Sequence, residues 1–202
     1  TPAVAYLTVA HGMDAGVMIS ASHNTFQFNG IKIFGPKGYK LTDREEAEIE
    51  DMILDDAIPM HKAEAGEIGR YSQGTGLAEE YIRHIAATLP GEKPLRGMRV
   101  LADCSNGSAS RTAKELFALL GAEADVICRE PDGVNVNRDC GSTHMESLRQ
   151  RVKAGGYALG VAFDGDADRC RAVDEKGDLV DGDQMIALVA TRVQEQGTQK
   201  KN

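Results

Sequence analysis

The sequence predicts an α/β protein made of two tandem three-layer α/β/α units with mainly parallel, partly mixed sheets, the first unit being incomplete. Short apolar segments alternate along the chain with segments of helical periodicity. Two capping boxes, Thr42 with Glu45 and Thr143 with Glu146, mark expected helix starts. The Gly- and Pro-containing segment GEKPLRG at 91–97 is the best boundary on composition. We therefore expect one unit at 1–91 and a second at 92–202.

The first unit is expected to contain helices around two short buried strands. Thr1 and Pro2 have the composition of a helix cap followed by the first helical residue. The expected elements are a helix after Thr1, strands at 16–19 and 31–34, a helix from Thr42 to about Leu54, and a helix after Gly76 that reaches Leu89.

The second unit has the more regular order of strands and helices. Its expected elements are strands at 98–103, 124–128, 158–163 and 169–174, and helices at 110–120, from Thr143 to about Lys153, and from Asp181 to about Gln194. This alternation favours a largely parallel sheet covered by helices.

Composition excludes several classes of partner. The 202 residues carry a net charge of −8, which argues against binding to nucleic acid or to an anionic membrane surface. No apolar run approaches the ~20 residues of a membrane helix, and no signal peptide opens the chain. The four cysteines form no CxxC pair, so we expect reduced thiols in a cytoplasmic protein.

The segment VAFDGDADRCR carries the strongest chemical signal. Asp164, Asp166 and Asp168 follow an apolar strand at alternate positions, with the small residues Gly165 and Ala167 between them. Three carboxylates this close repel one another unless a cation is bound. Oxygen-only ligands suit Mg²⁺ or Ca²⁺. The pattern therefore predicts a metal site.

Three other interpretations of this acidic loop are open to the sequence. One is a solvated acidic turn. An EF-hand would use Glu175 as its twelfth residue, but Arg169 stands where that loop needs glycine, and strands rather than helices flank it. An Asp nucleophile, as in haloacid-dehalogenase phosphatases, is disfavoured because the loop comes late in the chain.

The segment ISASHNTFQFNGIKIF at 19–34 places reactive groups between two apolar strands. Ser22 is followed by His23 and Asn24, and Lys32 lies ten residues after the serine. Adjacent Ser and His are poor evidence for a hydrolase, and a simple turn with a surface histidine is an alternative. Together with the acidic loop, however, these groups suit phosphoryl transfer, which needs positioning and charge neutralisation.

SASHN, NGIK and DGDADR occur in the order found in the α-D-phosphohexomutases, and the chain resembles that family. Its members interconvert sugar 1-phosphates and 6-phosphates through an active-site phosphoserine. The segment NVNRDCGSTHMESL at 135–148 resembles the phosphoglucosamine mutase branch. Family members have four domains, and the resemblance covers the second half of domain one and all of domain two. The C-terminal domains of the same protein would be a further partner.

The resemblance implies roles for individual residues. Ser22 would be the phosphoserine, and its phosphate a further ligand of Mg²⁺ bound by Asp164, Asp166 and Asp168. The groups that orient phosphate or transfer protons would be His23, Lys32 and Arg169. We expect Lys32 to accept the proton of the sugar hydroxyl, because a lysine pKa can be lowered toward neutrality. Thr25 stands where the family usually has proline, which puts the rigidity of the loop in question.

The implied reaction is the interconversion of glucosamine 6-phosphate and glucosamine 1-phosphate through a bisphosphate intermediate. The alternatives are a phosphoglucomutase or phosphomannomutase, and a metal-binding fragment without activity. The expected small-molecule partners are sugar phosphates. Because the sugar-reading domains would be missing, this chain is expected not to isomerise sugars by itself.

Overall fold

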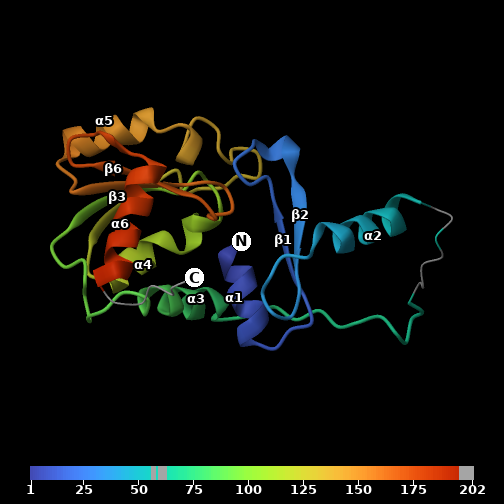
Figure 1. Ribbon diagram of the computed structural model, residues 1–202. Coiled ribbons are helices and arrows are strands. Elements are labelled where there is room, and N and C mark those ends of the chain that lie inside the picture. Colours follow the sequence, from blue (N-terminus) through green and yellow to red (C-terminus); the bar gives the residue numbers. More distant parts are fainter. Residues whose placement is uncertain (56–57, 59–62, 196–202) are drawn as a thin grey trace. The chain divides into compact units, whose positions relative to one another are not determined.

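The computed structural model describes residues 1–55, 58 and 63–195 (Figure 1). The chain forms two compact units, Thr1–Ile19 with Ile31–Tyr81 and Ser20–Gly30 with Ile82–Asn202. The segment that carries Ser22 thus belongs to the second unit, although the segments before and after it in sequence belong to the first. The boundary expected at 91–97 stays a prediction.

Helices and a short sheet make up the first unit. Its elements are α1 (Pro2–Ala10), β1 (Gly16–Ser20), β2 (Gly30–Phe34), α2 (Asp43–Leu54) and α3 (Leu77–Ala86), whose end continues into the second unit. β1 pairs with β2. The capping box predicted for α2 is confirmed: the Thr42 hydroxyl accepts the N–H of Glu45 at 3.4 Å, and the Glu45 carboxylate accepts the N–H of Thr42 at 2.8 Å.

Two expectations for the first unit are corrected. β1 and β2 were expected to be buried, but Val17, Ile19 and Ile31 are each more than half exposed. β1 and β2 form a two-stranded sheet whose outer face is not covered within the described ranges. α3 ends at Ala86 and not at Leu89, because the Thr88 hydroxyl donates to the carbonyl of Ile85 and the chain turns.

The second unit is built on a five-stranded mixed sheet, which confirms the α/β class. Its elements are η1 (Phe26–Phe28), β3 (Arg99–Asp103), η2 (Ser108–Arg111), α4 (Ala113–Leu119), β4 (Glu123–Ile127), η3 (Gly141–Thr143), α5 (Glu146–Gly155), β5 (Leu159–Phe163), β6 (Cys170–Asp174), β7 (Leu179–Val180) and α6 (Gly182–Glu195). The strand order is β4-β3-β5-β6-β7. β3 is parallel to β4 and β5, whereas β6 is antiparallel to β5 and β7.

Helices cover both faces of the sheet: α4 lies on one side and α5 on the other (Figure 1). The core on the α4 side includes Val100, Ala102 and Phe117. The core on the α5 side includes Leu101 and Leu148. Successive residues of β3 point to opposite faces and both faces are covered, so its central residues 100–102 form a continuous apolar run.

The start of α5 differs from the prediction. The prediction of a second capping box, formed by Thr143 and Glu146, is wrong. Thr143 lies in η3, and the N-cap residue of α5 is Met145, whose side chain makes no capping hydrogen bond. Met145 is 6% exposed and Leu148 0% exposed. Burial of these two side chains against the sheet therefore sets the helix start in place of a polar cap. The short strand β7 was not predicted.

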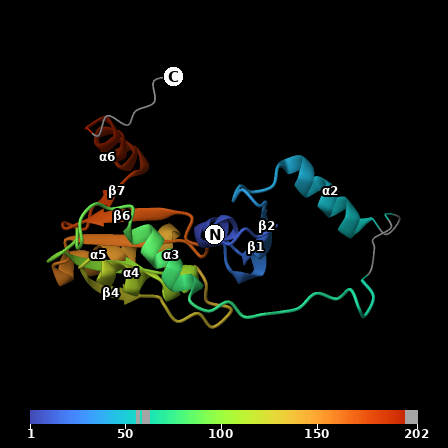
Figure 2. The ribbon, with the colours of Figure 1, turned by 90° about the horizontal axis from the view of Figure 1, so that it is seen from below.

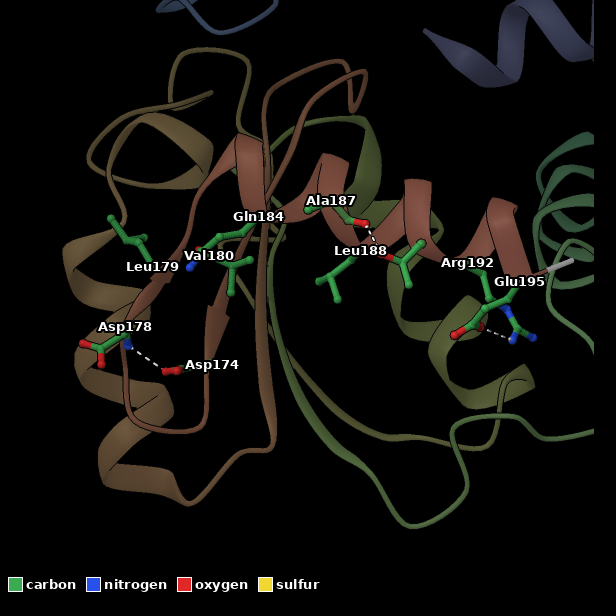
Figure 3. A pocket seen from close by; sticks show the side chains of 10 residues that line it. Asp174, Asp178, Leu179, Val180, Gln184, Ala187, Leu188, Arg192 and Glu195 are labelled. Atoms are coloured by element: carbon green, nitrogen blue, oxygen red, sulfur yellow. Dashed lines mark hydrogen bonds and ion pairs between the residues drawn. The ribbon is translucent and has the colours of Figure 1, made fainter. Parts of the chain in front are cut away.

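α6 projects away from the sheet (Figure 2), and none of its described side chains is buried. Asp181 and Gln184 begin it by exchanging two hydrogen bonds, each from a backbone N–H to the other side chain, at 2.9 and 2.7 Å. An open groove separates its Leu188 side from β7 (Figure 3). In the part of the chain that the structure describes, no helix combines the length and the apolar character needed to cross a membrane.

Candidate functional site

The acidic loop lies where β5 ends and the chain turns back into the antiparallel strand β6. The N–H of Ala167 donates to the carbonyl of Asp164 at 3.1 Å and closes the turn. Ala167 has φ 53°, a left-handed conformation that is uncommon for a residue other than glycine. This tight reversal brings alternate residues of the loop to the same side.

The structure brings the three predicted carboxylates together. One oxygen from each of Asp164, Asp166 and Asp168 lies within 4.8 Å of the others. Asp164 and Asp166 are 0% exposed, whereas Asp168 is exposed. Burial raises the pKa of Asp164. The backbone N–H of Arg169, which donates to the Asp164 carboxylate at 3.1 Å, lowers that pKa, and the negative charges of Asp166 and Asp168 raise it. Buried carboxylates with like charges are stabilised by a cation, and the all-oxygen set fits Mg²⁺ or Ca²⁺.

The serine loop lies against this cluster within the second unit. Ser22 Oγ is 3.4 Å from a carboxylate oxygen of Asp164, a long contact for a hydroxyl donor. The carbonyl of Ser22 accepts the N–H of Gly165 at 3.0 Å. Ser22 has φ 51°, an uncommon conformation for a residue other than glycine, which its neighbours must enforce. The hydroxyl is therefore held beside the carboxylates by the backbone as well as by its own contact.

Asn137 fixes the serine loop, and the sequence interpretation did not assign it a role. Its side-chain N–H₂ group donates to the carbonyls of Ser22 and Asn24, each at 2.7 Å. The side chain is 3% exposed, and the backbone N–H donates to the carbonyl of Ser105 at 2.9 Å. Asn137 lies in the segment NVNRDCGSTHMESL, which had been noted only as a family signature.

Two glycines let these loops approach closely. A Cβ atom on Gly165 would lie 2.6 Å from the carbonyl oxygen of Ser22. A Cβ atom on Gly107 would collide with the carbonyl of Gly165, which accepts the N–H of Ser108 at 2.8 Å. The acidic loop is thus packed between the serine loop on one side and the loop after β3 on the other.

The other predicted site residues differ in their surroundings. His23 is half-buried, and its Nδ1 atom has no hydrogen-bond partner among the residues described. Arg169 is exposed and enters the cluster through its backbone N–H. Lys32 lies on β2 in the first unit and is half-buried. Its placement relative to Ser22 stays a prediction.

Comparison with protein families gives two matches along the chain. Residues 1–58 match a model described as phosphoglucomutase/phosphomannomutase, alpha/beta/alpha domain I. Residues 79–177 match the corresponding model of domain II. A curated relative, the phosphoglucosamine mutase of Acetivibrio thermocellus, is 48% identical over 202 residues, which are all of this chain and 44% of the relative. The chain thus spans less than half the length of that relative.

Solved structures with a similar fold include proteins named as members of the same family. A phosphoglucomutase/phosphomannomutase family protein from Burkholderia thailandensis superposes with a TM-score of 0.74 at 26% identity, over 91% of this chain and 38% of that one. The N-acetylphosphoglucosamine mutase of Aspergillus fumigatus, in complex with GlcNAc-6P and magnesium, superposes with a TM-score of 0.53 at 19% identity, over 94% of this chain and 51% of that one. At this identity the second likeness concerns the fold alone.

Proposed function

The chain belongs to the phosphoglucomutase/phosphomannomutase family, and on that premise we propose that it is part of a phosphoglucosamine mutase. This isomerase would interconvert glucosamine 6-phosphate and glucosamine 1-phosphate. The observation that supports it best is the hydroxyl of Ser22 beside three converging carboxylates. A relative of 48% identity that bears this name favours the amino sugar over glucose or mannose phosphates.

The proposed metal is Mg²⁺, held by one oxygen each from Asp164, Asp166 and Asp168 and by a phosphate on Ser22. The donor set consists only of oxygens, and two of the three carboxylates are completely buried. Bound there, Mg²⁺ would neutralise the phosphoserine and polarise its phosphorus. A protein of the same fold was crystallised with magnesium and a sugar phosphate, in keeping with this proposal.

The chain's own residues would then position the transfer. The phosphorus–oxygen bond to Ser22 breaks as the sugar hydroxyl oxygen forms its bond to phosphorus. Lys32 accepts the proton of that hydroxyl, and the oxygen of Ser22 takes up a proton from solvent when it leaves. Arg169 and His23 bind phosphoryl oxygens. The Nδ1 atom of His23, which has no hydrogen-bond partner among the residues that the structure describes, would do so as an N–H donor. The second transfer, from the other sugar position, returns a phosphoryl group to Ser22.

Intact mass tests the central step directly. The 202-residue chain is incubated with glucosamine 1,6-bisphosphate and Mg²⁺, and its mass should increase by one phosphoryl group. Ser22→Ala should abolish the increase, whereas Ser72→Ala, at an exposed serine, should leave it unchanged. Asp166→Asn should slow labelling at least tenfold, with Asp183→Asn as the matched exposed control. Labelling that persists in Ser22→Ala would contradict the proposal.

Sugar preference requires a second assay. A protein of the length of the curated relatives that carries this sequence is given amino and neutral hexose phosphates, and the ratio of kcat/KM values is measured. Glucosamine phosphate should be preferred. In the same protein, Lys32→Met should reduce kcat by about 10²–10⁴-fold, the usual contribution of general acid–base catalysis. A loss below tenfold would transfer the proton-transfer role from Lys32 to His23 or Arg169.

A further inference from the structure

A second group of potential metal ligands lies in the second unit, apart from the acidic loop. One atom from each of Asp103, Cys128 and Cys140 lies within 4.8 Å of the others. Asp103 ends β3, Cys128 directly follows β4, and Cys140 directly precedes η3. We propose that these three residues form a site for Zn²⁺ or a similarly thiophilic divalent cation, independent of the mutase reaction.

The chemistry of the donors distinguishes this group from the acidic loop. Thiolate sulfur selects Zn²⁺ and related cations, whereas carboxylates alone suit Mg²⁺ and Ca²⁺. Zinc–sulfur bonds of about 2.3 Å and zinc–oxygen bonds of about 2.0–2.2 Å put tetrahedral sulfur and oxygen ligands about 3.5–3.8 Å apart. The three atoms of the cluster, all within 4.8 Å of one another, are in the range from which such a geometry can form. Three protein ligands leave a fourth position for water.

The ligands are held in place before any metal binds. The two carboxylate oxygens of Asp103 accept the backbone N–H groups of Ser105 at 2.9 Å and Gly141 at 3.0 Å. Each oxygen keeps a second lone pair, so coordination does not require these bonds to break. The side-chain N–H₂ group of Asn106 donates to the sulfur of Cys140 at 3.9 Å. Such supporting contacts orient metal ligands and raise affinity.

Burial and charge also fit a metal ion. Asp103 is 1% exposed and Cys140 3% exposed, whereas Cys128 is half-buried and gives a route from solvent. Binding would release the two thiol protons to solvent and leave one net negative charge on the cluster. Burial raises the pKa of Asp103, and the positive charge of Arg151, an exposed residue of α5, partly opposes that rise. The charge of Arg151 would offset the remaining negative charge.

Competition with a chromophoric chelator tests the proposal. The reduced 202-residue chain is titrated with Zn²⁺ in excess Mg²⁺, which keeps the acidic loop occupied. The chain should bind one Zn²⁺. Cys128→Ser and Cys140→Ser should weaken that affinity at least tenfold, whereas Cys170→Ser, at an exposed cysteine, and Asp166→Asn should leave it unchanged. Affinity should also fall at lower pH, because protons compete for the thiolates.

Alkylation of the wild-type chain needs no variant and covers the case in which a substitution prevents folding. Zn²⁺ should slow modification of Cys128 at least tenfold, as measured by peptide mass, and should leave Cys170 unaffected. Equal rates with and without Zn²⁺ would overturn the proposal. So would Zn²⁺ binding that survives both cysteine substitutions, or binding that is lost in Asp166→Asn, which would place the ion on the acidic loop.

Discussion

The second unit buries carboxylates at one end of its sheet and exposes apolar side chains on the helix α6. We call that end, where β3, β4 and β5 finish, the sheet edge. At the sheet edge, Asp103, Asp164 and Asp166 are at most 1% exposed. On α6, Ile186, Leu188 and Val189 are each more than 60% exposed. Charged groups are thus inside and apolar groups outside. Buried charges persist where backbone N–H groups and neighbouring loops hold them, as they do for Asp103 and Asp164.

The contrast indicates which part of the second unit carries its stability. Backbone hydrogen bonds and close glycine contacts connect the acidic loop with the serine loop and with the loop after β3, and backbone hydrogen bonds connect the loops after β3 and β4. α6 lies beyond residue 177, where the match to domain II ends, and its apolar side chains are exposed. Substitutions in the sheet and its edge should therefore cost far more stability than equivalent substitutions in α6.

The largest difference is expected between two leucines. Leu148→Ala removes a completely buried side chain between α5 and the sheet and should lower the free energy of unfolding by about 2–5 kcal/mol. Leu188→Ala, on exposed α6, should change it by no more than about 0.5 kcal/mol. Urea denaturation of the 202-residue chain measures both. Equal losses would show that α6 is packed in solution and would contradict this contrast.

Two glycines give the next largest difference. Gly107→Ala would drive a methyl group into the backbone of Gly165, where no flexible side chain can move aside, and should cost about 1–3 kcal/mol. Gly182→Ala, at the first residue of α6, meets nothing within 4 Å and should change stability by less than about 1 kcal/mol. Thermal unfolding compares the two. Gly107→Ala should also slow phosphoryl labelling of Ser22, and normal labelling would show that the acidic loop tolerates displacement.

Asn137 should have a smaller effect on stability but a clear one on Ser22. Asn137→Gly keeps the left-handed backbone, φ 55°, and removes the two hydrogen bonds to the serine loop. The expected loss is about 1–2 kcal/mol. If the lost hydrogen bonds position Ser22 for the transfer, labelling of Ser22 should slow about tenfold for each 1.4 kcal/mol by which the activation free energy rises. A stability loss with unchanged labelling would mean that Asn137 supports the fold without positioning the serine.

Local signals in the sequence predicted much of this unit. β3 and β5 were placed correctly because each is a short apolar run between turn residues. The convergence of the three aspartates could be predicted because they are neighbours in sequence. The contacts of Asn137 with the serine loop and the approach of Cys128 to Cys140 could not be predicted, because the fold alone brings these distant residues together. The antiparallel strand β7, with two residues, is too short to leave a periodic pattern.

The two predicted capping boxes also show that a local sequence pattern does not reveal contacts that only the fold creates. Thr42 and Glu45 have the right types at the right spacing, and so do Thr143 and Glu146, yet only the first pair caps a helix. α2 has no buried residue among those described, so local hydrogen bonds decide where it begins. At α5, packing of Met145 and Leu148 against the sheet outweighs the polar cap.

The smallest expected effect tests that explanation. Thr42→Ala removes the side-chain cap of α2 and should destabilise the helix by about 0.5–2 kcal/mol, whereas Thr143→Ala should change stability by less than about 0.5 kcal/mol. Amide hydrogen exchange of Glu45 reports the first change, and urea denaturation reports the second. A comparable loss in both variants would mean that Thr143 caps α5 in solution.

The effect at Thr42 should also depend on pH. Hydrogen bonds from the backbone N–H and the hydroxyl of Thr42 lower the pKa of Glu45 below 4.5 in the folded chain. The unfolded chain therefore takes up the proton first as the pH falls. The contribution of the Glu45 carboxylate is fully present above pH 4.5 and is lost as the pH falls through the lower folded value. Amide exchange in α2 should accelerate over that window in the wild type and change less in Glu45→Gln. An identical acceleration in the two proteins would show that the carboxylate charge does not stabilise the cap.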